Sequence, residues 1–225
     1  MTAIPLENDH EIEYPETDGE PMGETDLHID EIEYLRIALR ERYRDAPDVY
    51  VASNLLLFYQ KGHPETFIVP DVFVAWGVSK DFRRNYLLWE EGAAPRLVVE
   101  VTSRSSRSRD LSFKKDLYER LGVEEYFLFD PYREYLRPPL QGFRLDGRRY
   151  RRIPEEPDGS LLSTTLGVAI RSEEFRLRLT DLETGAPLLR PQEMAAAHRE
   201  SEEARRQAEE RVRALEEEIA RLRGE

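Results

Sequence analysis

One strand–helix–strand succession constrains the fold of this chain more than any other feature. Residues 96–102 read RLVVEVT, residues 110–121 have a helical spacing of leucines, and residues 124–131 read EEYFLFDP. Continuous aliphatic and aromatic residues, in place of clean alternation, are typical of central strands that are covered on both faces. Because a crossover of this kind almost always joins parallel strands, the stretch predicts an α/β domain.

Further elements are predicted on either side of this unit. Residues 25–43 have the spacing of an amphipathic helix, and His28 lies on its apolar stripe. Later in the chain we expect antiparallel hairpins added to the main sheet, one of them with an Asp146–Gly147 turn. Two more strands are predicted at residues 49–59 and 67–76.

The two ends of the chain differ from this centre. Residues 1–24 are acidic and rich in Pro and Gly, which predicts a flexible arm, and residues 25–190 are predicted to form the folded domain. Residues 191–225 predict one long helix with a heptad seam whose last positions favour a two-stranded parallel coiled coil. The alternative is a single solvated helix packed on its own domain. The seam residues are Met194, His198, Ser201, Arg205, Ala208, Val212, Leu215, Ile219 and Leu222.

Charge is distributed unevenly along the chain. The net charge is −13, but residues 1–34 hold 12 acidic residues and no Lys or Arg, so the remainder is close to neutral. Residues 79–152 carry 17 Lys or Arg against 12 Asp or Glu. A basic centre with an acidic arm is compatible with binding a polyanion such as DNA.

Cysteine usage and hydropathy exclude several classes of protein. The chain has no cysteine, which excludes disulfides and thiolate metal sites. It has no apolar run long enough to cross a bilayer and no secretory signal, so we expect a cytoplasmic protein without a membrane partner.

Two carboxylates stand where ionised groups are expensive to bury. Glu100 interrupts the apolar strand at residues 96–102, and Asp71 follows Pro70 at the beginning of another apolar run. If the two strands pair antiparallel, Asp71 and Glu100 lie close together, and a divalent cation would offset their repulsion. Oxygen ligands without cysteine or paired histidines favour Mg²⁺ or Mn²⁺ over zinc.

The helix that follows Glu100 supplies a lysine. At 100° per residue, Lys114 falls at the centre of an apolar arc that also contains Leu111 and Tyr118, whereas Lys115 falls outside it. Lys114 can therefore extend toward the carboxylates, where an ammonium can hold an attacking water or stabilise charge on a phosphoryl oxygen. Asp110, one turn earlier, can pair with Lys114.

These residues belong to two stretches, PDVFVAWG and LVVEVTSRSSRSRDLSFKKDLYERLGVEEYFLFDP, that closely resemble the Uma-type family of restriction endonucleases in the PD-(D/E)XK nuclease superfamily. The resemblance covers roughly residues 22–190 and implies a restriction-endonuclease-like core, a mixed β-sheet flanked by helices. It makes Asp71 and Glu100 the metal-binding carboxylates. Thr102 stands where the superfamily has its lysine, and in such families the lysine is taken to have moved onto the following helix, which matches Lys114.

Four further parts of the chain are candidates for a supporting role. His28 matches a histidine that recurs in the family, and it could touch the site or a phosphate; Glu31, at the edge of the same stripe, could do the same. The backbone carbonyl of Val101 could assist in holding the metal. The SRSSRSRD run is either a solvated loop or a phosphate-binding segment. Its candidate DNA-binding residues are Arg104, Arg107 and Arg109.

The leading interpretation is a Mg²⁺-dependent endodeoxyribonuclease that uses two carboxylates and a lysine, and that pairs as a homodimer through its C-terminal helix. One alternative is a catalytically silent nuclease-like domain that serves as a coiled-coil interaction module. Another is a metal-dependent hydrolase of RNA or of small phosphodiesters. The sequence shows no helix-turn-helix, zinc finger or aromatic single-strand platform that would read a nucleic acid separately.

Overall fold

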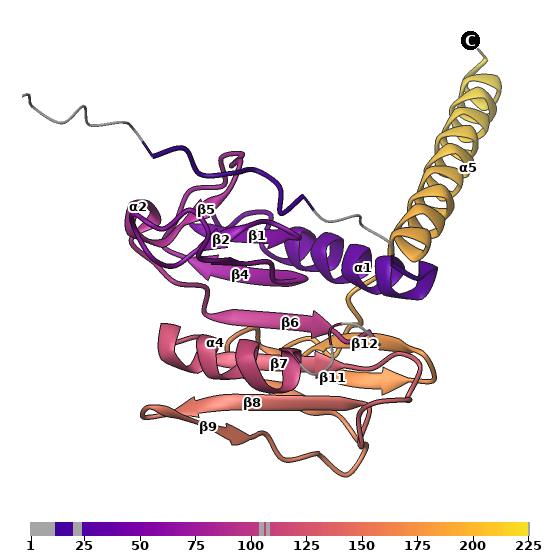
Figure 1. The fold of residues 1–225 in the computed structure, drawn as a ribbon. Coiled ribbons are helices and arrows are strands. Elements are labelled where there is room, and N and C mark those ends of the chain that lie inside the picture. The colour runs from indigo at the N-terminus through magenta and orange to yellow at the C-terminus, as the bar shows by residue number, and fades with distance from the viewer. Residues whose placement is uncertain (1–11, 20–23, 104–105, 107–108, 225) are drawn as a thin grey trace, which may run out of the picture. The chain divides into compact units, whose positions relative to one another are not determined.

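The computed structural model describes residues 12–19, 24–103, 106 and 109–224, and it divides into two compact units, Met1–Leu188 and Leu189–Glu225. Figure 1 shows the elements. In chain order they are α1 (Asp26–Arg42), β1 (Val49–Ser53), β2 (Leu57–Phe58), β3 (Phe67–Ile68), β4 (Val72–Trp76), β5 (Tyr86–Leu87), α2 (Leu88–Glu91), β6 (Leu97–Val101), the π-helical turn η1 (Asp110–Lys114), α4 (Lys115–Leu121), β7 (Glu125–Phe129), β8 (Leu140–Asp146), β9 (Arg149–Arg152), β10 (Leu161–Ser163), β11 (Val168–Glu173), β12 (Arg176–Asp181) and α5 (Pro191–Arg223).

A six-stranded mixed sheet forms the centre of the first unit, in the order β1-β4-β6-β7-β8-β9. Strands β6 and β7 pair in parallel, as the strand–helix–strand succession predicted, and the other neighbouring pairs are antiparallel. Two three-stranded sheets, β10-β11-β12 and β3-β2-β5, accompany it. The expected α/β fold is confirmed. Of the expected antiparallel hairpins, β8–β9 extends the main sheet, whereas β11–β12 belongs to a three-stranded sheet of its own.

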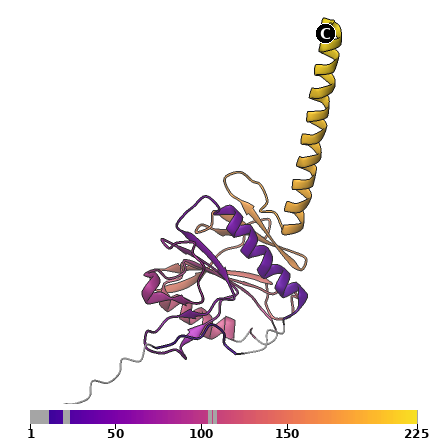
Figure 2. The same ribbon diagram turned by 90° about the horizontal axis from the view of Figure 1, so that it is seen from above.

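Alternate residues of the central strands face two separate cores. Val72 and Val74 pack with α1 residues such as Leu35, whereas Phe73 packs with Tyr118 of α4. Helices α1 and α4 therefore cover different faces of the sheet, as Figures 1 and 2 show. Helix α1 begins after Thr25, whose hydroxyl accepts the N–H of His28 and caps the helix.

Two predicted strands are interrupted, and both interruptions lie next to Asp71. The predicted strand at 49–59 breaks after Ser53, because Asn54 has a positive φ of 51°. The N–H of Asn54 donates to the carbonyls of Pro70 and Asp71, at 3.1 and 3.2 Å. The predicted strand at 67–76 is divided around Pro70, which has no N–H to give to a sheet. Asp71 therefore occupies a fixed bend between β3 and β4.

Part of the acidic arm packs against the loops and short strands of the first unit, to which it belongs. The ring of Tyr14 lies 5.1 Å, centroid to centroid, from the rings of both Phe58 and Trp89. Its hydroxyl accepts the N–H of Gly62 at 2.8 Å, and Glu16 pairs with Arg84 at 2.7 Å. The rest of the predicted flexible arm, apart from residues 12–19 and Glu24, lies outside the described residues.

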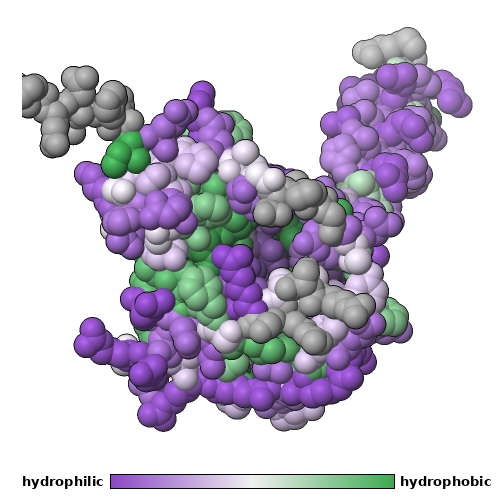
Figure 3. Space-filling view, viewed as in Figure 1, coloured by the Kyte–Doolittle hydropathy of each residue, from purple (hydrophilic) through white to green (hydrophobic). Residues whose placement is uncertain are grey.

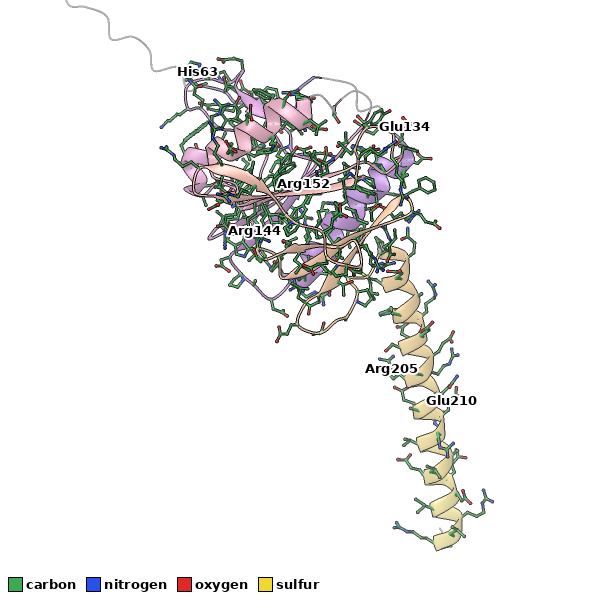
Figure 4. The ribbon with its side chains drawn as sticks, turned by 90° about the horizontal axis from the view of Figure 1, so that it is seen from below. His63, Glu134, Arg144, Arg152, Arg205 and Glu210 are labelled. Carbon is green, nitrogen blue, oxygen red and sulfur yellow. The ribbon has the colours of Figure 1, made fainter. Side chains whose placement is uncertain are left out.

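Helix α5 forms most of the second unit. None of its described residues is buried within this chain. Figure 3 shows it as mostly hydrophilic, and Figure 4 shows side chains, including Arg205 and Glu210, that project outward from it. Its exposed apolar seam consists of Val212 (54% exposed), Leu215 (50%), Ile219 (47%) and Leu222 (80%). Among the described helices, α5 included, none has the length and apolar character needed to span a membrane.

Candidate active site

Asp71 and Glu100 meet where the beginning of β4 lies beside the end of β6. The strands pair antiparallel with Val72 opposite Val99, which is the condition under which the sequence places the two carboxylates together. The N–H of Asp71 donates to Glu100 Oε2 at 3.4 Å, and the N–H of Val101 donates to Asp71 Oδ2 at 2.7 Å. The two carboxylates are thus fixed against each other's strand. The Glu100 side chain is fully buried, whereas that of Asp71 is 16% exposed.

Lys114 reaches the same place from the π-helical turn η1. Its Nζ donates to Glu100 Oε2 at 2.7 Å and to the carbonyl of Val69 at 3.3 Å, and it lies 3.2 Å from Asp110 Oδ1. The hydroxyl of Ser106 donates to the other oxygen of Asp110 at 2.6 Å. Lys114 and Asp110 therefore share the turn and face the sheet together, and π-helical turns of this kind are frequent at functional sites.

The π-helical turn also corrects one expectation. The helical wheel placed Leu111 on the buried arc with Lys114, but Leu111 is 41% exposed and Asp110 is buried instead. A wheel drawn at 100° per residue assumes an α-helix, whereas a π-helix advances less per residue, so positions before Lys114 rotate away from the predicted face. Positions after Lys114 follow the α-helical wheel, and Leu117 and Tyr118 are buried as expected.

Tyr118 is a site residue that the sequence did not reveal. Its hydroxyl donates to Glu100 Oε1 at 2.7 Å, so both oxygens of this buried carboxylate are engaged, one by Tyr118 and one by Lys114. A tyrosine on an apolar arc is indistinguishable in the sequence from a core residue. The one available signal was its spacing of four residues from Lys114, which places both side chains on one face.

His28 approaches the pair from the first turn of α1. Its Nε2 lies 3.5 Å from Asp71 Oδ2, and its Nδ1 lies 3.2 Å from Glu24 Oε2. Burial alone would lower the pKa of His28, but Asp71 and Glu24 outweigh that effect and raise it. His28 therefore lies beside the more exposed carboxylate, whose charge raises its pKa.

The site contains more negative charge than its lysine can compensate. Burial raises the pKa of Glu100 well above its ordinary value; Lys114 opposes the shift, and the nearby charges of Asp71 and Asp110 add to it. Burial also raises the pKa of Asp110. Although burial would raise the pKa of Asp71, its hydrogen bond to His28 and the charge of Lys114 lower it. A further cation would relieve this crowding.

Comparison with known proteins gives the family. The profile of a family described as "Uma2: Putative restriction endonuclease" matches residues 1–177, which is most of the chain. This chain belongs to the Uma2 family. A solved structure, of a "putative nuclease belonging to DUF820" from Anabaena variabilis, is similar at 14% identity with a TM-score of 0.48; the likeness covers 65% of this chain and 76% of that one. No curated protein matches.

The other predicted site residues of this Uma2 chain lie apart from the pair or outside the described residues. Glu31 is buried, and its carboxylate accepts the N–H of Leu177 at 2.7 Å, which fastens α1 to β12. Arg109 is exposed, with its guanidinium 5.6 Å from the Phe113 ring. Arg104 and Arg107 lie outside the described residues. Their predicted contact with DNA phosphates therefore stays a prediction.

The donors that converge here suit a hard, hydrated cation. Across the described ranges, no group of three or more Asp, Glu, His or Cys side chains could hold a metal ion. Asp71, Glu100 and the backbone of Val101 offer oxygen atoms only, and Mg²⁺ typically takes one or two carboxylates while it keeps several waters. Thr102, at the superfamily's lysine position, is buried, and its hydroxyl has no hydrogen-bond partner among the described residues. The crowded carboxylates therefore fit Mg²⁺ or Mn²⁺.

Proposed function

We propose that this Uma2 protein is a metal-dependent endonuclease that hydrolyses phosphodiester bonds in DNA. The observation that carries the proposal is the convergence of Asp71 and Lys114, from two separate elements, on the buried carboxylate of Glu100. The family description, which names restriction endonucleases, supports the same class of reaction.

In this proposal Asp71 and Glu100 hold Mg²⁺ or Mn²⁺, assisted by the carbonyl of Val101. Such an ion, when bound, polarises the phosphate and lowers the pKa of a bound water. The two carboxylates differ in their exposure to solvent, and we assign them different roles for that reason. Asp71, which is 16% exposed, is open to an incoming phosphate, whereas Glu100 is fully buried and is held in place by Tyr118.

Lys114 supplies the positive charge that the reaction needs beside the cleaved bond. An ammonium donor near developing negative charge stabilises it most strongly in a site that excludes water. Lys114 is 7% exposed, and its Nζ keeps contacts with Asp110 and with the carbonyl of Val69 that do not depend on Glu100. It can therefore donate to an attacking water or to a phosphoryl oxygen while it stays anchored.

His28 contributes a second donor on the open side of the site. Its raised pKa favours the imidazolium form, and it lies against Asp71, the carboxylate nearest to solvent. A protonated histidine at that point can hydrogen-bond an oxygen of the scissile phosphate. We therefore assign His28 to substrate phosphate binding.

We further propose that α5 pairs with α5 of a second copy in a parallel coiled coil. Val and Ile at a with Leu at d favour two parallel strands, and the apolar seam defined above has this pattern. In that register Arg211 would face Glu216 of the second copy, and Glu218 would face Arg223, so that both pairs attract. Sedimentation equilibrium should show a dimer that Leu215→Glu converts to a monomer; a wild-type monomer would contradict the pairing.

The test of the proposed activity compares three substrates in the presence of Mn²⁺ or Mg²⁺. Supercoiled plasmid, a structured RNA and a chromogenic phosphodiester are incubated with wild type and with Asp71→Asn. We expect nicking and linearisation of the plasmid by wild type only. Cleavage of RNA or of the small phosphodiester without plasmid cleavage would favour the other hydrolase. No cleavage of any substrate would favour a catalytically silent interaction module.

A further inference from the structure

A basic pocket opens at the free edge of β1, away from the carboxylate pair. Its volume is about 300 Å³. Three cationic residues and three aromatic residues line it, contributed by α1 and the turn after it, by β1 and by the loop after β4. They are Arg40, Tyr43, Arg44, Tyr50, Lys80 and Phe82. Strand β1 pairs on its other side with β4, so the pocket lies at the outer edge of the main sheet.

Two of the cations are fixed by backbone carbonyls in place of carboxylates. Lys80 Nζ donates to the carbonyls of Tyr43 and Arg44, at 2.5 and 2.9 Å, and Arg40 Nε donates to the carbonyl of Val51 at 3.1 Å. Within the part of the chain that the structure describes, neither Lys80 nor Arg40 pairs with an acidic side chain. Their positive charge is therefore oriented but not neutralised.

The direction of the pKa shift of Arg40 also indicates that no acidic side chain neutralises it. Burial and the neighbouring charge of Arg36 both lower the pKa of Arg40, the reverse of the effect a carboxylate partner would have. Arg44, by contrast, pairs with Glu41, and the carboxylate of Asp81 accepts the hydroxyl of Ser79. An anion that entered the pocket would therefore meet Arg40 and Lys80 without competition from these two acids.

An exposed aromatic ring stands beside these cations. Phe82 is fully exposed, although contact with water is unfavourable for so large an apolar side chain. Tyr50 is stabilised on its own side of the pocket by the guanidinium of Arg83, 4.2 Å from its ring centroid. Cations next to an open aromatic face are the combination that proteins use to hold the phosphate and the base of an unpaired nucleotide.

We propose that this pocket binds one unpaired nucleotide of a DNA strand, with its phosphate on Arg40 and Lys80 and its base against Phe82. The inference rests on the proposed nuclease function and adds a second contact with the same substrate. Helix α1 connects the two places, because His28 lies in its first turn and Arg40 follows twelve residues later, about 18 Å along the axis. That distance corresponds to about five nucleotide steps along a duplex.

The pocket is assembled from segments that the sequence could not bring together. Arg40 belongs to α1 and Arg44 to the turn after it, and Lys80 and Phe82 belong to a loop more than thirty residues later. None of these residues forms a motif, which is why no single-strand platform was recognisable in the sequence.

The test measures DNA binding by the full-length protein in EDTA, where cleavage plays no part. Fluorescence anisotropy compares a short single-stranded DNA with a duplex of the same sequence. We expect Phe82→Ala to weaken single-strand binding about tenfold, because a base loses its stacking partner, and to leave duplex binding within about twofold. Lys80→Ala should weaken both and reduce the slope of log K against log salt by about one.

Matched surface variants provide the controls. Phe175 is also an exposed phenylalanine, and Lys61 is an exposed lysine outside the pocket, so Phe175→Ala and Lys61→Ala should bind like wild type. Wild-type affinity in Phe82→Ala and Lys80→Ala, or no DNA binding by wild type, would overturn the inference. Because the assay needs no catalysis, a protein that binds through the pocket but never cleaves would refute only the proposed nuclease function.

Discussion

Two fully buried glutamates, Glu100 and Glu125, lie on neighbouring strands of the same sheet and differ in the charges around them. Glu125 has a cation of its own, since Arg144 donates to Oε1 at 2.9 Å. It also accepts hydrogen bonds from neutral donors in the segment 163–165. Glu100 shares its one lysine with Asp110 and lies beside Asp71.

The difference separates a structural carboxylate from one that is suited to chemistry. A buried carboxylate with its own cation and several neutral donors is satisfied and ties elements together, here β7, β8 and the segment after β10. A buried carboxylate that shares its lysine with a second carboxylate and lies beside a third is crowded by negative charge, which raises its pKa. Such groups are common in active sites, because crowded and buried charges shift pKa values toward those that catalysis needs.

Replacing each glutamate by glutamine should give the largest contrast. We expect Glu100→Gln to lower plasmid cleavage about a thousandfold or more, because a metal ligand is lost, and Glu125→Gln to leave cleavage within a few-fold. Stability should respond in the reverse order. Glu125→Gln should lose about 1–3 kcal/mol of unfolding free energy, since Arg144 loses its charged partner.

The measurements are nicking rates and urea unfolding on the same preparations. Glu125→Gln could instead abolish cleavage as fully as Glu100→Gln while the protein remains folded. Cleavage would then require any buried glutamate of this sheet, and the distinction between Glu100 and Glu125 would be wrong.

The adjacent lysines offer the next contrast. Lys114→Ala removes the lysine that contacts Glu100, so cleavage should fall about a hundredfold to a thousandfold. Unfolding free energy should fall by about 3–5 kcal/mol, because buried carboxylates lose their cation. Lys115, whose Nζ lies 4.2 Å from the Phe143 ring, should change both by little when replaced by alanine. Equal loss of cleavage in both variants would contradict the assignment.

The main parts of the site were predictable because they follow from periodicity. Asp71 and Glu100 stood out as carboxylates in apolar strands, antiparallel pairing placed them together, and the helical wheel chose Lys114 over Lys115. Tyr118 was missed because its ring packs in the core, and only the position of its hydroxyl reveals its role.

The fold was predictable to a similar extent. The prediction was wrong where the local backbone geometry departs from regular helices and strands. The parallel β6–β7 pair followed from the strand–helix–strand order, but the breaks beside Asp71 depend on the positive φ of Asn54 and on Pro70. The exposure of Leu111 depends on a π-helical turn, and no residue pattern in the sequence predicts that turn. Contacts between distant segments, such as Tyr14 with Trp89, carry no periodic signal at all.

Two tyrosines beneath the site give a smaller and sharper contrast. Tyr118→Phe removes the hydrogen bond to Glu100 Oε1, and we expect the affinity for Mn²⁺ to fall about tenfold to a hundredfold, because the carboxylate is no longer oriented. Tyr126→Phe removes a hydroxyl that donates to the backbone carbonyl of Asp110 at 3.1 Å. Its affinity should stay within about threefold of wild type. Calorimetric titration of Mn²⁺ measures both, and equal affinities would show that Tyr118 is only a core residue.

The smallest effect concerns pH and a third carboxylate. The hydrogen bond from Arg42, together with those from Thr184, lowers the pKa of Asp181 below that of an unfolded chain. The stabilisation is therefore complete above the ordinary pKa of an aspartate, about 4, and is lost as the pH falls through the lowered value. Asp181→Asn should show a weaker loss of unfolding free energy between about pH 5 and pH 2 than wild type. An unchanged acid profile would contradict the pairing.

The most direct test of the central claim is a calorimetric titration of Mg²⁺ and Mn²⁺ into wild type, Glu100→Gln and Glu125→Gln. The account predicts saturable binding to wild type and to Glu125→Gln, and none to Glu100→Gln, because only the crowded carboxylate pair holds the ion. Equal binding to all three proteins, or no binding to wild type, would contradict it.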